Sequence, residues 1–249
     1  LLLGPEGGCA INIGGIANAT MCIPATVGTR KEPALRAGDT GPGNGLIDAA
    51  AAERTGTACD TDGALAKAGN VHEQLLQALL ADPYFALPFP KSTGREYFSP
   101  AWLAARAREA QVDLAELRTE DVLATLTELT ARALADALTR ETQAEPQMRL
   151  HITGGGTHNP TLMTRIAKLL PACTVETGPL GGLDPDIKEA FLMALIGYFS
   201  AHGLPGALTD ATGAHSPSVL GQLTPPSALR DVPLMKEAPR QLLVEDSRE

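Results

Sequence analysis

Within its first forty residues the chain contains short runs of apolar, β-prone residues with polar residues between them. Cys9–Ile13 and Ile16–Ile23 predict two strands, and the Gly14-Gly15 pair between them predicts that they form a β-hairpin. A third short strand is expected at Leu35–Ala37, where the chain leads into a glycine-rich loop. The N-terminal part of the chain is therefore predicted to consist of strands rather than helices.

The middle of the chain carries signals for helices instead of strands. Alanines predict a helix over residues 46–54, and Ser99 followed by Pro100 predicts one over 99–111. Apolar spacing predicts helices over 71–81 and 119–142, the last with an apolar stripe at Val122, Leu126, Leu129, Ala133 and Ala137. The stretch 60–70 is polar and rich in turn residues. Three prolines within 83–98 argue against a helix there, and this stretch is interpreted either as a functional loop or as a rigid connector pinned by aromatic side chains. A mostly helical region is therefore expected at about residues 60–145.

A second set of strands follows this helical region. Arg149–Thr153 and Thr174–Thr177 are predicted strands, with a helix over residues 161–170 between them. An apolar helix is expected from Asp186 to about Ser200, and residues 226–249 are expected to be a disordered tail. Strands on both sides of a helical region predict an α/β protein.

Composition excludes several classes of function. The 249 residues carry 20 Lys and Arg against 29 Asp and Glu, a net charge of −9, with no basic cluster for nucleic acid. No apolar run is long enough to span a membrane. Four scattered cysteines and five scattered histidines form neither a disulfide framework nor a zinc pattern, which favours reduced thiols in a cytoplasm. A cytoplasmic protein with no nucleic-acid and no membrane partner is expected.

The loop Asp39–Asn44 (DTGPGN) is the first candidate for chemistry. It lies between the third strand and a predicted helix for which Asn44 is the expected N-cap and Gly56 the expected end. Such a turn presents free N–H groups and the positive end of the helix dipole to a ligand, and it holds Asp39 as a fixed base beside them. An ordinary glycine-rich loop with a capping Asp explains the same residues.

The second candidate is the run of Gly154, Gly155 and Gly156 between a strand and a helix. Three glycines remove every side chain from the turn, so a flat ring or a ribose could rest on bare backbone there. Glu189, early in the last apolar helix, is interpreted either as a carboxylate that stabilises the helix dipole or as an acid aimed at the same cleft as Asp39. The sequence therefore indicates one cleft built from several distant stretches.

Six motifs occur together in a fixed order. They are Asn12–Asn18 (NIGGIAN), Asp39–Asn44 (DTGPGN), Pro90–Glu96 (PKSTGRE), Thr153–Asn159 (TGGGTHN), Asp186–Ala190 (DIKEA), and Thr212-Gly213-Ala214 with Val219-Leu220-Gly221. Over residues 4–225 the chain resembles the anhydro-N-acetylmuramic acid kinase family of the actin, Hsp70 and sugar-kinase superfamily. The resemblance implies a ribonuclease-H-like (actin-like ATPase) α/β lobe, with a mixed sheet flanked by helices and a mostly helical insertion. It implies that residues 1–225 form the second, C-terminal lobe.

The resemblance also implies a reaction and a set of site residues. Members of this family use ATP, Mg²⁺ and water to open the 1,6-anhydro ring of anhydro-N-acetylmuramic acid and to phosphorylate O6, which gives N-acetylmuramate 6-phosphate in cell-wall recycling. Asp39 matches the catalytic aspartate that deprotonates the water. The implied cofactor-binding residues are Gly14, Gly15, Gly154, Gly155, Gly156 and Asn159, the implied sugar-binding residues are Asn18, Thr40, Gly41 and Asn44, and Glu189 matches an acid near the metal.

The sequence departs from the family pattern at its start and leaves two alternatives open. It contains neither the phosphate loop nor most of the first lobe, so this chain alone is expected to bind ATP poorly and to turn over little. The first alternative is a kinase for another 1,6-anhydro-sugar such as levoglucosan, and the second is a non-catalytic nucleotide-binding fragment. The expected partners are a small-molecule sugar and, since members of the family are often dimers, a second copy of the chain.

Overall fold

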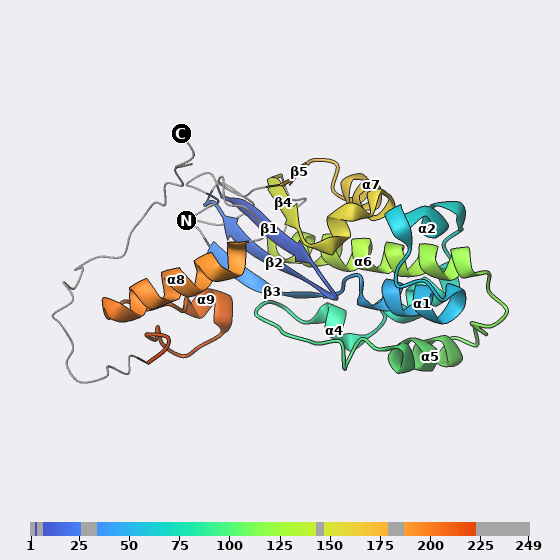
Figure 1. The fold of residues 1–249 in the computed structure, drawn as a ribbon, viewed down its shortest axis with the longest axis horizontal. Helices are drawn as coiled ribbons and strands as arrows, with labels where there is room; N and C mark the ends of the chain where they lie inside the picture. Colours follow the sequence, from blue (N-terminus) through green and yellow to red (C-terminus); the bar gives the residue numbers. More distant parts are fainter. Residues whose placement is uncertain (1–2, 4–6, 26–33, 143–146, 179–186, 223–249) are drawn as a thin grey trace.

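A five-stranded mixed sheet flanked by helices forms the centre of the computed structural model, which describes residues 3, 7–25, 34–142, 147–178 and 187–222 (Figure 1). The strands are β1 (Gly8–Ile13), β2 (Ile16–Ile23), β3 (Ala34–Pro42), β4 (Arg149–Thr153) and β5 (Thr174–Thr177). Their spatial order is β3-β2-β1-β4-β5, in which β2 runs antiparallel to β1 and β3 while β4 runs parallel to β1 and β5. The predicted α/β lobe with a mixed sheet flanked by helices is confirmed.

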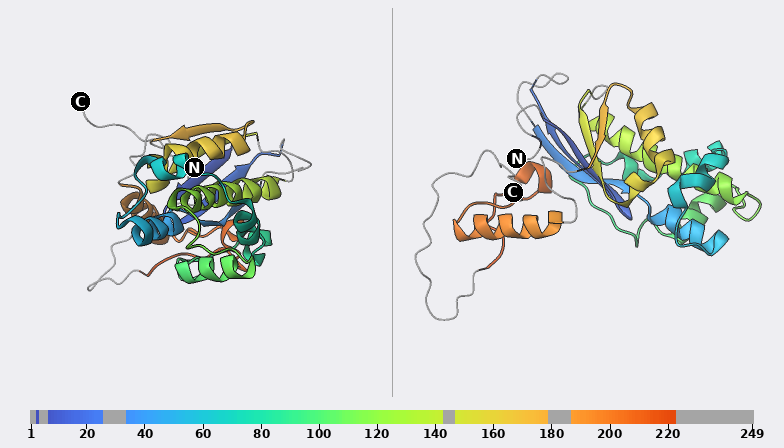
Figure 2. Two further views of the ribbon diagram at one scale, coloured as in Figure 1. Left: turned by 90° about the vertical axis from the view of Figure 1, so that its right-hand side faces the viewer. Right: turned by 45° about the horizontal axis from the view of Figure 1, so that its top comes forward.

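The helices are α1 (Gly45–Thr55), η1 (Thr61–Gly63), α2 (Ala64–Ala68), α3 (Glu73–Leu80), α4 (Pro83–Ala86), α5 (Pro100–Glu109), α6 (Thr119–Thr142), η2 (Gly155–His158), α7 (Pro160–Leu169), α8 (Lys188–Ala201) and α9 (Thr209–Thr212). Helices α6 and α7 cover one face of the sheet, α1, α2 and α5 lie beyond the ends of its strands, and α8 and α9 lie on the opposite side from α6, where α9 packs against β3 (Figures 1 and 2). The long helix α6 packs against β2 and β3 and also against α1, α2, α3 and α7. Helices α2 to α6 occupy the stretch for which a mostly helical region is predicted.

Helix α6 joins two groups of buried apolar side chains. Its first half packs into a cluster with α1, α3 and α5, and its second half packs with α7 on the sheet. The predicted stripe is buried along its whole length, at Val122, Leu126, Leu129, Ala133 and Ala137. This burial explains why a helix of 24 residues forms where the sequence predicts it.

The sheet buries one face and leaves the other polar. Ile11 and Ile13 of β1 and Ala17 and Ala19 of β2 are at most 1% exposed and belong to the core. The residues that alternate with them, such as Asn12 and Asn18, are only half-buried, because neighbouring positions on a strand point to opposite faces. The polar face therefore carries side chains that the core does not use.

Two short helices correct the sequence predictions. The stretch 60–70, predicted as turns, contains η1 and α2, because the Asp60 carboxylate accepts hydrogen bonds from the N–H groups of Leu65 and Ala66, both at 2.9 Å. Helix α4 forms where prolines argued against a helix. Pro83 takes its first position, where no N–H is needed, and the Asp82 carboxylate accepts from the N–H two residues later.

Strand β3 is a further correction, because it extends through Asp39 to Pro42, a stretch predicted as a turn. Pairing with β2 continues to the end of β3 across a register shift between Ala17 and Asn18. The other predicted helices and strands begin and end within two residues of their predicted positions, while η2 and α9 form where no helix is predicted.

Some predictions concern residues that the structure does not describe. The predicted start of the last apolar helix at Asp186 and the predicted tail over residues 226–249 both lie outside the described residues. In the described part of the chain, no helix combines the length and the apolar character that crossing a bilayer requires.

Candidate active site

Four polar side chains form a row across the polar face of the sheet. Asn12 of β1 pairs with Asn18 of β2 and with Thr153 of β4, and Asn18 pairs in turn with Asp39 of β3. Residues that are paired in register share one face of a sheet, and the Thr153 hydroxyl lies 3.5 Å from Asn12 Oδ1. The row therefore runs from the strand before the triple-glycine turn to the carboxylate of Asp39.

Asp39 is half-buried and is held through both its main chain and its carboxylate. Its N–H donates to the Lys91 carbonyl at 2.9 Å, and its carbonyl accepts from the Tyr84 hydroxyl at 2.8 Å. Its Oδ2 accepts from the Thr93 N–H at 2.8 Å and from Ser92 Oγ at 3.1 Å. Within the described residues no hydrogen bond reaches Oδ1, so the carboxylate has one anchored oxygen and one oxygen that can accept a proton.

A buried carboxylate supports the loop that holds Asp39. Asp82 is 4% exposed and accepts hydrogen bonds of 2.8 to 2.9 Å from the Tyr84 N–H, the Tyr97 hydroxyl and Trp102 Nε1. The Phe98 ring meets the rings of the same three residues edge-on, with centroids 4.9 to 5.3 Å apart. The stretch 83–98 is thus a rigid connector that also contacts the candidate base. Sequence reasoning missed Asp82, although an Asp before a Pro is a helix N-cap signal.

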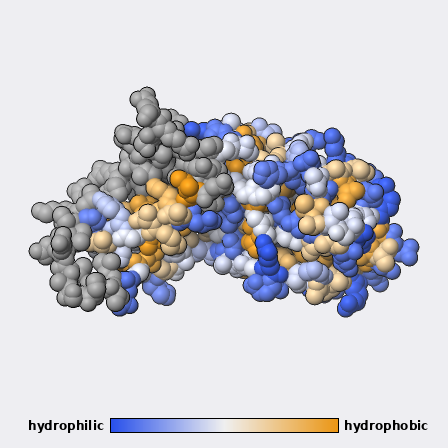
Figure 3. All heavy atoms as spheres, in the orientation of Figure 1, coloured by the Kyte–Doolittle hydropathy of each residue, from blue (hydrophilic) through white to orange (hydrophobic). Residues whose placement is uncertain are grey.

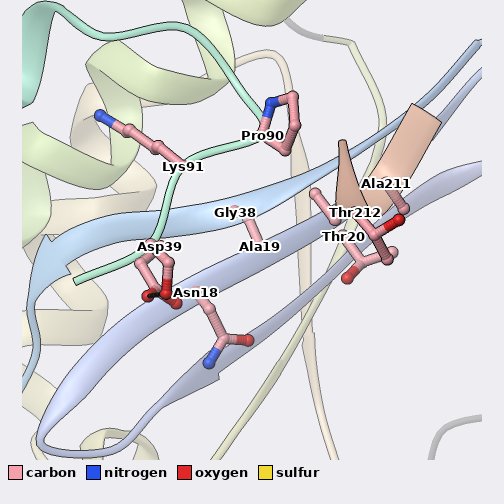
Figure 4. A pocket seen from close by; sticks show the side chains of 11 residues that line it. Asn18, Ala19, Thr20, Gly38, Asp39, Pro90, Lys91, Ala211 and Thr212 are labelled. Carbon is pink, nitrogen blue, oxygen red and sulfur yellow. Dashed lines mark hydrogen bonds between the residues drawn. The ribbon is translucent and has the colours of Figure 1, made fainter. Parts of the chain in front are cut away.

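Lys91 belongs to this support rather than to the polar row. Its Nζ donates to the Tyr84 carbonyl at 3.0 Å and lies 4.4 Å from the centroid of the Tyr84 ring. Burial lowers the pKa of Lys91 to about 8, with a further contribution from Arg140, while burial and the Asp39 charge raise the pKa of Tyr84. Figure 4 shows the Lys91 side chain pointing away from Asn18 and Asp39.

A cavity of about 520 Å³ opens beside Asp39 (Figure 4). Its walls come from β2, β3, α9 and the loop after the Phe89–Pro90 peptide, and they comprise Asn18, Ala19, Thr20, Ala37, Gly38, Asp39, Pro90, Lys91, Ser92, Ala211 and Thr212. Asn18 and Asp39 point toward the same side in Figure 4. A cavity of this volume is within the range that small-molecule ligands occupy.

The Gly14-Gly15 turn closes on the start of α1. The N–H groups of Gly43 and Gly45 donate to the Gly15 carbonyl at 3.0 and 3.1 Å, and the N–H of Asn44 donates to the Gly14 carbonyl at 2.7 Å. The expectation that the turn after Asp39 presents free N–H groups is therefore wrong for these three residues, because the hairpin uses them. Asn44 does precede α1, but its side chain makes no capping hydrogen bond.

The triple-glycine turn offers bare backbone at two of its three positions. Gly154, with a φ of 89°, and Gly155 are exposed, and a Cβ on Gly155 would lie 3.3 Å from the side-chain nitrogen of Asn44. Gly156 is buried against β1, where a Cβ would collide with a core side chain. Asn159 is also buried, and its Oδ1 accepts an N–H of α7 at 2.9 Å. Gly156 and Asn159 therefore have structural contacts, while Gly154 and Gly155 face outward.

Two residues predicted to bind the sugar lie inside the protein. Thr40 is 1% exposed, and its hydroxyl donates to the Ala17 carbonyl at 3.2 Å. Gly41 is buried against the ring of Phe85, with a φ of 148°. The extension of β3 explains this difference, because strand pairing turns both residues away from the surface that carries Asp39.

Glu189 is exposed in the first turn of α8. No group of three His, Cys, Asp or Glu side chains that could hold a metal ion occurs among the residues that the structure describes. The stretch 179–186 that leads to Glu189 lies outside them. A role for Glu189 at a metal stays a prediction.

Comparison with solved structures finds a protein with a partly similar fold. The activator of the 2-hydroxyisocaproyl-CoA dehydratase from Clostridium difficile, with bound ADPNP, aligns with 69% of this chain and 55% of its own, at 12% identity and a TM-score of 0.41. A match this weak adds nothing to the fold as described above by its strand order.

Sequence comparisons identify the family. The family model of anhydro-N-acetylmuramic acid kinase matches residues 5–226. Relatives with that name in Streptomyces avermitilis and Xanthomonas axonopodis pv. citri are each 44% identical to the chain, over 95% and 89% of its length. These alignments cover 57% and 56% of the two relatives, so the chain spans a little over half of their length. The chain belongs to the anhydro-N-acetylmuramic acid kinase family.

Proposed function

We propose that this chain is the second lobe, over residues 1–225, of an ATP-dependent kinase that acts on anhydro-N-acetylmuramic acid. The name shared by relatives at 44% identity supports the choice of sugar. The observation that carries the proposal is the carboxylate of Asp39, which is anchored through Oδ2 at the wall of a cavity of about 520 Å³. A base fixed in this way beside a ligand-sized space is the arrangement that general base catalysis requires.

Asp39 would act on water in the proposed reaction. Its Oδ1 takes a proton from a water molecule as the water oxygen bonds to the anomeric carbon of the sugar. The bond between that carbon and O6 breaks, O6 takes the γ-phosphoryl group of ATP, and ADP leaves. The hydrogen bonds from Thr93 and Ser92 hold the carboxylate in one orientation during this step, because they occupy its other oxygen. The products are N-acetylmuramate 6-phosphate and ADP.

The exposed glycines are proposed to face the nucleotide. Gly154 and Gly155 offer bare backbone at the Thr153 end of the polar row, where an adenosine could rest. Gly14 and Gly15 are proposed to border the phosphates at the centre of the row. Mg²⁺ would neutralise phosphate charge, and a single carboxylate such as Glu189 suffices for it, since Mg²⁺ keeps most of its waters.

The remaining polar residues of the row are proposed to contact the sugar. Asn18 lines the cavity beside Asp39 and can both donate to and accept from sugar hydroxyls. Asn44 lies next to Gly155, at the boundary between the two substrates. We place the reaction in the cytoplasm, in cell-wall recycling, because ATP is available there and the four scattered cysteines form no disulfide framework in the sequence.

The test uses a protein of the relatives' full length that contains this chain. With ATP, Mg²⁺, anhydro-N-acetylmuramic acid and water labelled with heavy oxygen, the product should carry the label at the anomeric carbon and none in the phosphate. Faster phosphorylation of levoglucosan than of the acid sugar would favour the kinase of another anhydro-sugar. Absence of any ATP-dependent product from either sugar would overturn the proposal and favour a non-catalytic fragment.

A further inference from the structure

Arg95 is a cation over the Gly14-Gly15 turn, on the loop whose Thr93 holds Asp39, and it has no hydrogen-bond or ion-pair partner among the described residues. Its side chain is exposed. Its charge lowers the pKa of Asp48, in the first turn of α1, against the larger raising effect of burial. The guanidinium lies directly over Gly15, where a Cβ would collide with it. Glycine at position 15 therefore leaves the space that the guanidinium occupies, because it has no side chain.

The other cations near Asp39 are already engaged. Arg36 donates to the Leu35 carbonyl at 2.9 Å and forms an ion pair with Glu141 at 3.7 Å. Lys91 donates to the Tyr84 carbonyl, as described above. Arg140 donates to the Phe85 carbonyl at 2.7 Å. Among these four cations, Arg95 is the one that the described residues leave available to a ligand.

The position of Arg95 is tied to that of the base. Thr93, two residues before it, donates its N–H to Asp39 Oδ2 at 2.8 Å. On its other side, the N–H groups of Tyr97 and Phe98 both donate to the Gly94 carbonyl at 3.2 Å. A loop fixed on both sides of Arg95 presents the guanidinium and the carboxylate of Asp39 as one unit.

We propose that Arg95 binds a carboxylate of the sugar substrate and so selects an acidic anhydro-sugar over a neutral one. This inference rests on the proposed function. Muramic acid carries a lactyl carboxylate that levoglucosan and anhydro-N-acetylglucosamine lack, and a guanidinium binds a carboxylate through two parallel hydrogen bonds. A carboxylate that enters beside Asp39 meets a like charge in a protein of net charge −9, so a cation is needed there.

The transferred phosphoryl group is the rival anion, since Gly15 is proposed to border the phosphates. Arg95 belongs to the loop that fixes Asp39, whereas the exposed glycines proposed for the nucleotide follow Thr153 at the other end of the polar row. The hydrogen bond between this loop and Asp39 favours the sugar as the partner of Arg95. The two anions predict different results, because only one of the two sugars below carries a carboxylate while both receive the phosphoryl group.

The experiment compares Arg95→Gln with the parent in the full-length protein on two sugars. For anhydro-N-acetylmuramic acid, kcat/KM should fall roughly 10- to 100-fold, mainly through KM, as expected for the loss of a hydrogen bond to a charged group. For anhydro-N-acetylglucosamine it should change by less than about 3-fold. If the parent does not turn over the neutral sugar, its inhibition constant against the acid sugar replaces kcat/KM.

Two further variants serve as controls. Arg95→Lys keeps the positive charge but lacks the paired N–H donors of the guanidinium, so it should recover part of the activity on the acid sugar. If Arg95→Gln does not fold, Arg95→Lys replaces it in the test. Arg108→Gln makes the same change on the exposed side of α5 and should match the parent on both sugars.

Equal losses on both sugars would overturn the inference and assign Arg95 to the phosphoryl group or to the fold, and unchanged rates on both would overturn it as well. A parent that phosphorylates neither sugar would instead remove the proposed function itself.

Discussion

The loop 83–98 and helix α8 differ in how well the described residues cover their apolar side chains. In the loop, Tyr84 and Phe98 are at most 7% exposed, and the buried Asp82 accepts three hydrogen bonds. In α8, Leu192, Met193 and Tyr198 are 47%, 63% and 40% exposed, although the helix is apolar on every side. Figure 3 shows hydrophobic residues gathered over α8 on the face drawn. Helices that are apolar all round are normally buried, so the comparison separates a self-supporting region from one that needs a cover.

This difference indicates which of the candidate site residues the described part of the chain holds in position. Asp39 and its anchors belong to the self-supporting region, since among the described residues Ser92 and Thr93 hold its carboxylate, and Tyr84 and Lys91 hold its main chain. Glu189 belongs to α8, whose apolar side chains the described residues do not cover. Substitutions in α8 are therefore expected to leave the position of Asp39 unchanged, whereas they are expected to displace Glu189, the proposed metal ligand.

The largest expected effect comes from removing the support of the loop. Asp82→Ala should lower the free energy of unfolding by about 3 kcal/mol, because three donors lose their buried acceptor. Urea denaturation followed by circular dichroism measures this change. Glu53→Ala, at an exposed position of α1, is the matched control and should stay within about 0.5 kcal/mol of the parent. A loss below about 1 kcal/mol for Asp82→Ala would contradict the self-supporting loop.

A smaller effect is expected from the titration of Lys91 in the same loop. The folded state lowers its pKa from 10.5 to about 8, so between these values the unfolded chain binds the proton more tightly. The unfolding free energy of the parent minus that of Lys91→Met should rise through this window, by less than about 1.4 kcal/mol per pH unit since the side chain is half exposed. A flat difference across this window would contradict the burial of Lys91.

The smallest expected effect is on α8. Leu192→Ala should change the unfolding free energy by about 0.5 kcal/mol or less, whereas the same substitution at the fully buried Leu129 of α6 should cost about 2–5 kcal/mol. Thermal and urea unfolding of both variants measure the contrast. A loss above about 1 kcal/mol for Leu192→Ala would show that α8 has a cover outside the described residues.

Local patterns predicted most of the fold. The hairpin of β1 and β2, the strands β4 and β5 and the helix α6 follow from apolar spacing and from Gly14-Gly15, which act over a few residues. The place of Gly154 and Gly155 between a strand and a helix also follows from neighbouring residues. These elements could be predicted because sequence neighbours determine them.

The rest of the site depends on contacts between distant residues. Asp39 lies in a strand because β2 pairs with β3 across a register shift, which also buries Thr40 and Gly41. The Gly14-Gly15 turn uses the N–H groups at the start of α1, and Arg95 reaches Gly15 from a loop 80 residues away in sequence (95 − 15). No spacing rule within one stretch predicts such contacts.

The most direct test of the account is Asp39→Asn in the full-length protein. Asn keeps the shape and can still accept the hydrogen bond from Thr93, but it cannot take a proton from water. Asp136→Asn, at an exposed position of α6, is the matched control. The account predicts that Asp39→Asn lowers kcat by about 100-fold or more while the dissociation constant of ATP stays within about 3-fold of the parent. A kcat equal to that of the parent would contradict the assignment of Asp39 as the base.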